Sequence, residues 1–180
     1  HAQDVESALP TANLQLHIVG NSRIGTALDG TPIAKYDETH TTNANGDITL
    51  SSVEYDSYTI TIDDADSDLA GMSAALPIVI APNTTNTLTL ETAPDAANTL
   101  LLTVRDASGN AITDASVLLA NASNTVNITQ NTNTNGQTFF TPLVAGTYTV
   151  TVTHNSYGTF QDSFDVTDDV VQTIPLTANP

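Results

Sequence analysis

Apolar and polar residues alternate with a period of two along most of this chain. The alternation is clearest at Leu14, Leu16 and Ile18; Tyr58, Ile60 and Ile62; Leu88 and Leu90; Leu102 and Val104; Tyr148, Val150 and Val152; Phe164 and Val166; and Ile174 and Leu176. Alternate side chains of a strand point to opposite faces, so this period is typical of half-buried strands. The sequence contains no comparable run with the helical period, and it therefore predicts an all-β protein.

Turn sequences containing glycine separate these segments. They read "LDGTP", "NANGD", "ASGNA", "NTNGQ" and "VAGTY". Glycine adopts a positive φ without steric cost, which tight turns between strands often require. Short strands separated by turns at this spacing predict a sandwich or a barrel.

The second half of the chain repeats the first. Asn45-Gly46 matches Asn135-Gly136, and Tyr58 matches Tyr148, with the same offset of 90 residues. Elsewhere "LQLHIV" matches "LLLTVR", "DGTPI" matches "SGNAI", and "TNTLTLE" matches "VQTIPLT". The offset changes between these pairs, as insertions in surface loops would produce. The pattern predicts a tandem duplication of one β-sandwich.

The repeat also predicts the domain boundaries. The chain has 180 residues, enough for two small all-β modules. We expect an N-terminal tail at residues 1–10, a first sandwich at 11–92, a linker at 93–98 and a second sandwich at 99–180. The tail is expected to be mobile or bound to a partner because it has no strand pattern.

A series of motif residues spans the second half from Leu100 to Leu176. Its members are Asp106, Gly109, Ile112, Ala115, Val117, Gly136, Gly146, Tyr148 and Val150. With these residues the segment resembles a carboxypeptidase regulatory-like domain, an Ig-like or transthyretin-like (prealbumin-like) sandwich closely related to Cna B-type modules. The resemblance implies an accessory module that occurs in many surface proteins. The two halves together are similar to pairs of such domains in bacterial surface and pilin-like proteins.

The composition excludes several classes of function. The net charge is −17, from 20 acidic and 3 basic residues, so the chain repels nucleic acid and anionic membranes. There is no cysteine, which removes disulfides and thiol chemistry. We found no G-x-S-x-G nucleophile elbow, and we expect a protein that is not an enzyme.

The polar composition points to an extracellular or cell-surface location. Thr, Asn, Ser and Asp are abundant, and Asn83, Asn121 and Asn127 begin Asn-x-Ser/Thr glycosylation sequons. Adaptation to salty water would produce the same acidic bias, and sequons arise by chance in a chain rich in Asn and Thr.

One segment has partial calcium-loop character. Asp64, Asp66 and Asp68 stand at alternate positions, as the oxygen ligands of Ca²⁺ often do. The helix-loop motif would need Gly where Leu69 stands and Glu where Ala75 stands, so a solvated acidic loop is the alternative. Calcium is the only cofactor that the sequence suggests. The four histidines have no metal-ligand spacing.

Exposed aromatic residues are the candidates for ligand binding. Tyr157 and Phe160 lie in the polar segment "HNSYGTF", and Tyr55 lies in "VEYDSY", where a sugar ring would stack on an aromatic face. The alternative is that Tyr157 packs across its own hairpin and that Tyr58 and Tyr148 are core or corner tyrosines.

The resemblance to Cna B-type modules also implies an isopeptide bond between Lys and Asn. Lys35 is the only lysine, so the second half cannot form this bond. In the first half, Lys35 with Glu38 or Glu54 and an asparagine is the one candidate, and a surface lysine is the alternative.

These observations favour a structural or adhesive surface protein, either a stalk or a pilin-like filament subunit. Its partners would be other surface subunits, with self-assembly through edge strands, or glycans and proteins of the surroundings. Pro175 favours an edge position for the last strand, since proline cannot donate to a ladder. The alternative is a recognition module that binds a glycan or a protein, with or without Ca²⁺.

Overall fold

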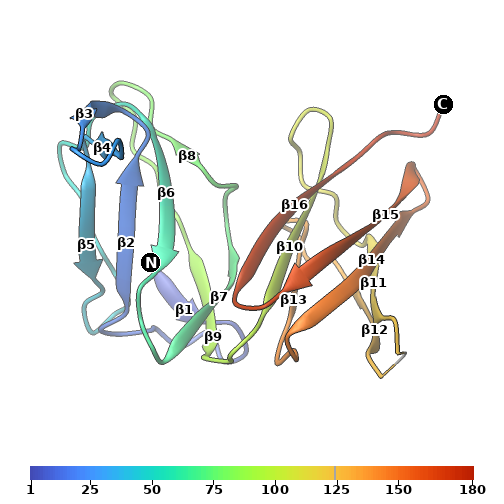
Figure 1. Ribbon diagram of the computed structural model, residues 1–180. Helices are drawn as coiled ribbons and strands as arrows, with labels where there is room; N and C mark the ends of the chain where they lie inside the picture. Colours follow the sequence, from blue (N-terminus) through green and yellow to red (C-terminus); the bar gives the residue numbers. More distant parts are fainter. Residues whose placement is uncertain (124) are drawn as a thin grey trace. The chain divides into compact units, whose positions relative to one another are not determined.

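A computed structural model describes residues 1–123 and 125–180, and these residues form strands, turns and loops (Figure 1). The chain divides into two compact units, unit 1 at His1–Asp95 and unit 2 at Ala96–Pro180. In the described part of the chain, no helix is long and apolar enough to cross a membrane. The predicted all-β class is confirmed.

Unit 1 contains two sheets and a separate hairpin. The first sheet has the order β1-β9-β7, with β1 at Ala2–Asp4, β9 at Leu90–Pro94 and β7 at Ser67–Met72. The second sheet has the order β5-β2-β6-β8, formed by Asp37–Thr41, Gln15–Gly20, Ser57–Ile62 and Ile78–Val79. The hairpin pairs β3 (Arg23–Thr26) with β4 (Pro32–Ala34).

Unit 2 is a sandwich of two sheets. One sheet has the order β13-β10-β16, formed by Gln137–Phe140, Leu100–Asp106 and Val170–Leu176. The other has the order β12-β11-β14-β15, formed by Asn127–Asn131, Ser116–Asn121, Gly146–His154 and Tyr157–Val166. As predicted from Pro175, β16 lies at the edge of its sheet.

The core of unit 2 follows the predicted alternation. Residues at alternate positions of three strands are 0% exposed: Leu100, Leu102 and Val104 of β10, Val117 and Leu119 of β11, and Val150 and Val152 of β14. In β10 the intervening Leu101 and Thr103 are buried as well, so this strand is covered on both faces. Burying apolar surface stabilises a fold by about 25 cal/mol per Å², so this buried face stabilises the unit. The core of unit 1 has fewer fully buried members and a larger rim of partly buried apolar residues.

The N-terminal residues were predicted to form a tail, and this prediction is wrong. Ala2 is 0% exposed, and β1 pairs in parallel with β9, with Ala2 opposite Leu90. The strand was missed because its three residues, "AQD", are too few to show an alternation. At the other end of unit 1, Ala93 and Pro94 continue β9 and do not belong to a linker.

Equivalent hydrogen bonds fix how the two units correspond. The amide of Ala2 donates to Gly46 O over 2.7 Å, as the amide of Val104 donates to Gly136 O over 2.7 Å. Ala2 O and Val104 O then accept from Thr11 and Ile112, each over 3.0 Å. Thus β1 corresponds to the second half of β10, and β2 corresponds to β11. The match of "LQLHIV" with "LLLTVR" was therefore wrong by one strand.

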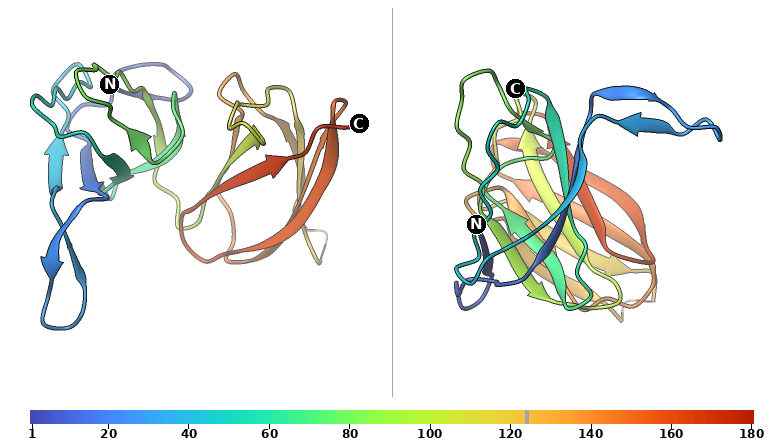
Figure 2. Two further views of the ribbon diagram at one scale, coloured as in Figure 1. Left: turned by 90° about the horizontal axis from the view of Figure 1, so that it is seen from above. Right: turned by 90° about the vertical axis from the view of Figure 1, so that its left-hand side faces the viewer.

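Among residues 1–123 and 125–180, the β3–β4 hairpin is an insertion found in unit 1. It projects from the rest of the unit (Figure 2), and Ile24 and Leu28 are 65% and 111% exposed. The described residues between the equivalent strands β11 and β12 of unit 2 include no further strand. The "DGTPI" turn lies in this insertion, so its predicted equivalence with "SGNAI" is wrong.

Candidate functional site

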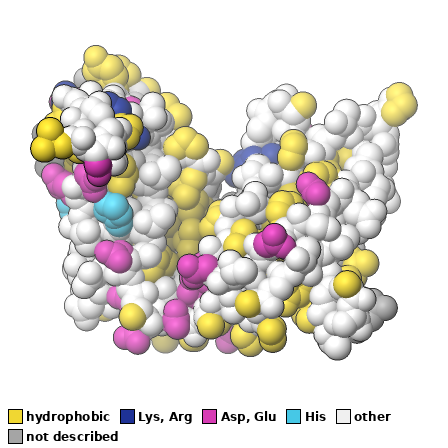
Figure 3. Space-filling view, viewed as in Figure 1, with side chains coloured by type: hydrophobic (Ala, Val, Ile, Leu, Met, Phe, Trp, Pro, Cys, Tyr) yellow, Lys and Arg dark blue, Asp and Glu magenta, His cyan; other side chains and the backbone are white. Residues whose placement is uncertain are grey.

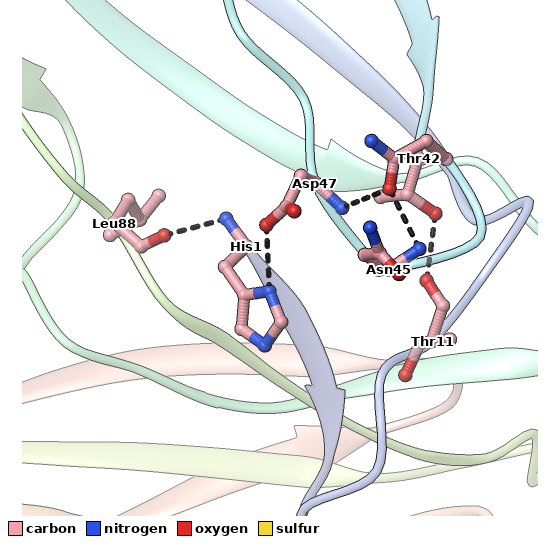
Figure 4. A network of polar contacts seen from close by, with 7 residues as sticks. His1, Thr11, Thr42, Asn45, Asp47 and Leu88 are labelled. Atoms are coloured by element: carbon pink, nitrogen blue, oxygen red, sulfur yellow. Dashed lines mark hydrogen bonds and ion pairs between the residues drawn. The ribbon is translucent and has the colours of Figure 1, made fainter.

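In each NG turn, the asparagine two positions before the Asn-Gly pair is the centre of a small network of hydrogen bonds. In unit 1, Asn43 Oδ1 accepts the amides of Asn45 and Asp47 over 2.8 and 3.0 Å. Thr42 Oγ1 donates to Thr11 O over 2.7 Å, which ties the turn to the chain that follows β1 (Figure 4). These contacts satisfy backbone groups of the turn.

Unit 2 repeats this network atom for atom. Asn133 Oδ1 accepts the amides of Asn135 and Gln137, each over 2.9 Å. Thr132 Oγ1 donates to Ile112 O over 2.7 Å. The two NG turns therefore have the same hydrogen-bonding arrangement.

Both units also contain a tyrosine corner. The Tyr58 hydroxyl donates to Glu54 O over 2.9 Å, and the Tyr148 hydroxyl donates to Val144 O over 2.6 Å. The tyrosines are 4% and 2% exposed. The interpretation of Tyr58 and Tyr148 as core or corner tyrosines agrees with these contacts.

A groove of about 460 Å³ opens in unit 1 between β5 and residues 49–54. On one side, Lys35 Nζ lies 2.6 Å from Glu54 Oε2, and this carboxylate raises the pKa of Lys35. On the other, His40 Nε2 lies 2.8 Å from Tyr36 Oη and 3.2 Å from Glu38 Oε2. Desolvation raises the pKa of Tyr36. The groove therefore combines an aromatic wall with donors and acceptors of both charges.

Sequence reasoning named Glu38 only as a candidate partner of Lys35 in an isopeptide bond, and it missed His40 as a residue of this groove. Glu38 and His40 pair with Ile18 and Leu16, whose side chains are buried. Polar residues therefore occupy the core-facing side of an edge strand. The available signal was the alternation of Glu38 and His40, which places both residues on one face of the strand.

Lys35 does not meet the requirement of a Cna B-type isopeptide bond. That bond needs a buried lysine, whereas the Lys35 side chain is 50% exposed and paired with Glu54. The alternative of a surface lysine agrees with this position.

The three aspartates of the predicted calcium loop lie in different surroundings. The amide of Asp66 donates to Asp64 Oδ1 over 2.9 Å, while Asp68 is 3% exposed in β7. Among residues 1–123 and 125–180, no three His, Cys, Asp or Glu side chains are grouped as a metal site would require. Calcium binding by these aspartates therefore stays a prediction that rests on the sequence.

The three candidate ligand-binding aromatics are not brought together by either unit. Tyr157 and Phe160 are partly buried and pack against the core of unit 2. Tyr157 also contacts the His154 ring, with centroids 5.3 Å apart, across its own hairpin. Tyr55 lies in unit 1 and is 72% exposed next to the groove residues Glu54 and Asp56. Ligand binding stays a prediction, and Tyr55 has the accessible ring.

The predicted glycosylation asparagines differ in accessibility. Asn83 and Asn127 are exposed. Asn121 is half-buried, and its side chain donates to Thr125 Oγ1 over 2.8 Å and accepts from the amide of Val126 over 3.1 Å. Modification at these positions stays a prediction, with Asn83 and Asn127 the more accessible acceptors.

Residues 99–178 match the family of carboxypeptidase regulatory-like domains. The resemblance expected for the second half is confirmed. The match covers unit 2 from Thr99, just before β10, to Ala178, beyond the end of β16. A search of curated proteins found no match to the sequence.

Among solved structures, the chain is similar to several pilins. A minor pilin of Streptococcus agalactiae is 14% identical, with 97% of this chain and 87% of that chain covered and a TM-score of 0.41. A shaft pilin of Lactobacillus rhamnosus GG is 12% identical, with 97% and 91% covered and a TM-score of 0.39. A streptococcal ancillary pilin is 14% identical, with 99% and 61% covered and a TM-score of 0.42.

Proposed function

We propose that this chain is a structural part of an extracellular surface protein, a stalk or pilin-like subunit without enzymatic activity. The proposal rests on the kind of side-chain contact that is found in both units. The groups common to both units, such as Asn43 and Asn133 or Tyr58 and Tyr148, all bond to the backbone. Lys35 and His40, which line the groove, are not repeated in unit 2.

Tandem sandwiches suit a structural role for a mechanical reason. Each unit has its own core, and β16 of unit 2 pairs in parallel with β10 along seven residues. Such pairing ties the last strand to the first, so pulling on the ends of a unit loads many backbone hydrogen bonds together. A repeated module of this kind provides length without a cofactor.

The charge distribution supports a surface location. The net charge is −17, and on the face shown in Figure 3 the acidic side chains are scattered instead of forming one patch. A dispersed negative charge keeps neighbouring chains apart and soluble. It provides no focused field for an anionic substrate.

Labelling of intact cells tests the proposal. Antibodies raised against the purified chain are expected to decorate the outside of unpermeabilised source cells, on stalks or filaments seen by electron microscopy. Labelling that appears only after permeabilisation would contradict the surface location. Labelling of a smooth cell surface without projections would support the surface location and contradict the filament.

The groove of unit 1 favours recognition as a second candidate function. Tyr55 is 72% exposed beside residues that line the groove, and aromatic faces next to polar groups are typical of glycan sites. Saturable binding in a glycan array that is lost in Tyr55→Ala and kept in Tyr157→Ala would support recognition. Absence of binding in the parent chain would reject it for the glycans tested.

A further inference from the structure

The β3–β4 hairpin is not part of either sheet of unit 1. Its two strands form a separate two-stranded sheet that projects from the unit (Figure 2). All four residues of β3 are exposed, and a Cβ built on Gly25 or Gly30 would meet no neighbour within 4 Å. A two-stranded hairpin that packs on nothing is only marginally stable in water. The hairpin therefore has open space beside it and gains stability when another surface covers it.

Hydrogen bonds hold the hairpin in one conformation. At the tip, the amide of Ala27 donates to Thr31 O over 2.8 Å. At the base, the amide of Lys35 donates to Ser22 O over 2.8 Å. An element that is already formed loses little conformational freedom when it binds, so this hairpin is suited to docking.

Large apolar side chains of the hairpin face water. Ile24 in β3 is 65% exposed, Leu28 at the tip is 111% exposed, and Ile33 in β4 is 43% exposed. Exposed apolar side chains that gather on one element, instead of standing singly, mark interaction sites. The described residues of the corresponding connection in unit 2 form no further strand, so the sandwich itself does not require these side chains.

The charge of the hairpin differs from that of the whole chain. Residues 22–35 contain two basic residues, Arg23 and Lys35, and one acidic residue, Asp29, which gives a net charge of +1 against −17 for the chain. Lys35 is paired with Glu54 over 2.6 Å, whereas Arg23 forms no ion pair with another described residue. Two copies of an acidic chain approach with less repulsion at an element that lacks the negative charge.

The order of side chains along the hairpin is complementary to itself. From base to tip the chain runs Arg23, Ile24, Gly25, Thr26, Ala27, Leu28, Asp29. When two copies lie antiparallel about a twofold axis at Thr26, Ile24 of each copy stands beside Leu28 of the other. In the same register Arg23 of each copy stands beside Asp29 of the other. Apolar pairs and pairs of opposite charge across an antiparallel contact are both favourable.

Side chains provide more of this contact than backbone pairing does. β4 begins with Pro32, which has no amide hydrogen to donate to an added strand, so the β3 side faces the second copy. β3 has four residues, and its register with β4 is irregular between Arg23 and Gly25. A long regular ladder between two copies is therefore not expected, and the contact depends on the apolar and charged pairs.

We propose that the β3–β4 hairpin joins two copies of this chain in a symmetric dimer. The two hairpins lie antiparallel about a twofold axis at Thr26, and each apolar and each charged pair occurs twice because the contact is isologous. A contact of this size is weak, so the dimer forms as the protein concentration rises. The inference goes beyond the proposed function, because it holds for the chain wherever the chain is located.

Exchanging the charges tests the register. Sedimentation equilibrium of the full chain measures the dissociation constant of the dimer. Arg23→Asp and Asp29→Arg each place like charges beside each other, so each variant alone is expected to dimerise at least tenfold more weakly than the parent. An equimolar mixture is expected to regain the affinity of the parent, because mixed dimers restore both charge pairs. A parent that is monomeric at the highest concentration measured, or a mixture no stronger than its components, would overturn the proposal.

Two further variants locate the apolar part of the contact. Leu28→Asp is expected to weaken the dimer at least tenfold because it places a charge beside Ile24 of the second copy. Leu9→Asp makes the same change at a 65% exposed leucine outside the hairpin, and it is expected to leave the dissociation constant unchanged. Equal effects of the two substitutions would reject the hairpin as the contact. Circular dichroism spectra matching the parent would show that the variants are folded.

A cysteine at the twofold axis tests the symmetry. The chain has no cysteine, so a single introduced thiol can pair only with its copy in a second chain. Thr26→Cys is expected to give a disulfide-linked dimer under mild oxidation. Thr31→Cys places the thiol at an exposed position beside β4 and is expected to cross-link at least tenfold more slowly. Equal rates for the two variants would overturn the antiparallel arrangement about Thr26.

Discussion

Asp162 stands opposite Val150 in the pairing of β15 with β14. Val150 is 0% exposed. Asp162 lies two positions from both Phe160 and Phe164, so it points to the same face of β15 as these residues, which pack against the core. A carboxylate is thus placed on the core-facing side of an edge strand, and it is exposed there because β15 ends the sheet order β12-β11-β14-β15. Inward-facing charges at an edge discourage pairing with another chain.

Replacing this charge is expected to open the β15 edge. In Asp162→Val the inward side becomes continuously apolar, so chains should associate and the molar mass in solution should exceed that of the parent chain. Ser163→Val changes the outward side of the same strand and should keep the molar mass of the parent chain. Size-exclusion chromatography with light scattering measures both. If Asp162→Val still has the molar mass of the parent chain at the highest protein concentration measured, the role of Asp162 is contradicted.

Two glycines of unit 2 allow a matched test of the NG turn. Gly109 and Gly136 have φ values of +82° and +72°, but only a Cβ on Gly136 would meet neighbours, at 2.5 Å from Val104 O. Gly109→Ala should cost about 1 kcal/mol from backbone strain. Gly136→Ala should cost about 3 kcal/mol or more, since the strand must also move. Urea unfolding measures both, and equal costs would contradict the close packing of the turn.

The Asp106 turn predicts a loss of stability in acid. Hydrogen bonds from the side chain and then the amide of Asn110 lower the pKa of Asp106 below 3.8. A lowered pKa in the folded state gives stability that is complete above the unfolded value and is lost as pH falls through the folded value. The melting temperature should therefore fall between about pH 5 and pH 2.

Asp106→Asn is the test of that acid dependence. The substitution removes the titrating group, so the variant should lose less of its melting temperature than the parent over the same pH range. An identical fall in parent and variant would show that Asp106 does not contribute. Asp4 occupies the equivalent turn of unit 1, and hydrogen bonds from Ser7 lower its pKa in the same direction.

Calcium addition and removal test the aspartate prediction. If Asp64, Asp66 and Asp68 bind Ca²⁺, millimolar calcium should raise the melting temperature and a chelator should reverse the rise, because a ligand of the folded state stabilises it by mass action. Asp64→Asn should abolish the rise, and Asp165→Asn in β15 should keep it. If calcium does not raise the melting temperature of the parent chain, the predicted calcium site is contradicted.

Much of the fold was predictable because it rests on local signals. The alternation identified β2, β6, β10 and β14, and the NG turns with their tyrosines showed the duplication. The start of unit 1 was not predictable in the same way. The strand β1 has three residues, and its pairing with β9 joins positions almost ninety residues apart, which no local pattern reveals.

The inserted hairpin explains the other error of alignment. Its "DGTPI" turn resembles the "SGNAI" turn after β10, whereas the true equivalent in unit 1 is the turn at Asp4, where the amide of Ala8 donates back to Asp4 O. Ala8 has a φ of +54° at the position that Gly109 fills in unit 2. The missing glycine concealed the equivalence. The groove was missed because it depends on the tertiary contact of β5 with residues 49–54.

The account holds that the two units are copies of one sandwich, in which residues 138–140 are paired in β13 and the corresponding residues 48–50 of unit 1 are not part of a strand. Hydrogen–deuterium exchange of individual amides in the full chain tests this most directly. We predict slow exchange at Thr138, Phe139 and Phe140, which lie in a paired strand, and exchange close to the unprotected rate at Ile48, Thr49 and Leu50. Equal protection of the two segments would contradict the claim.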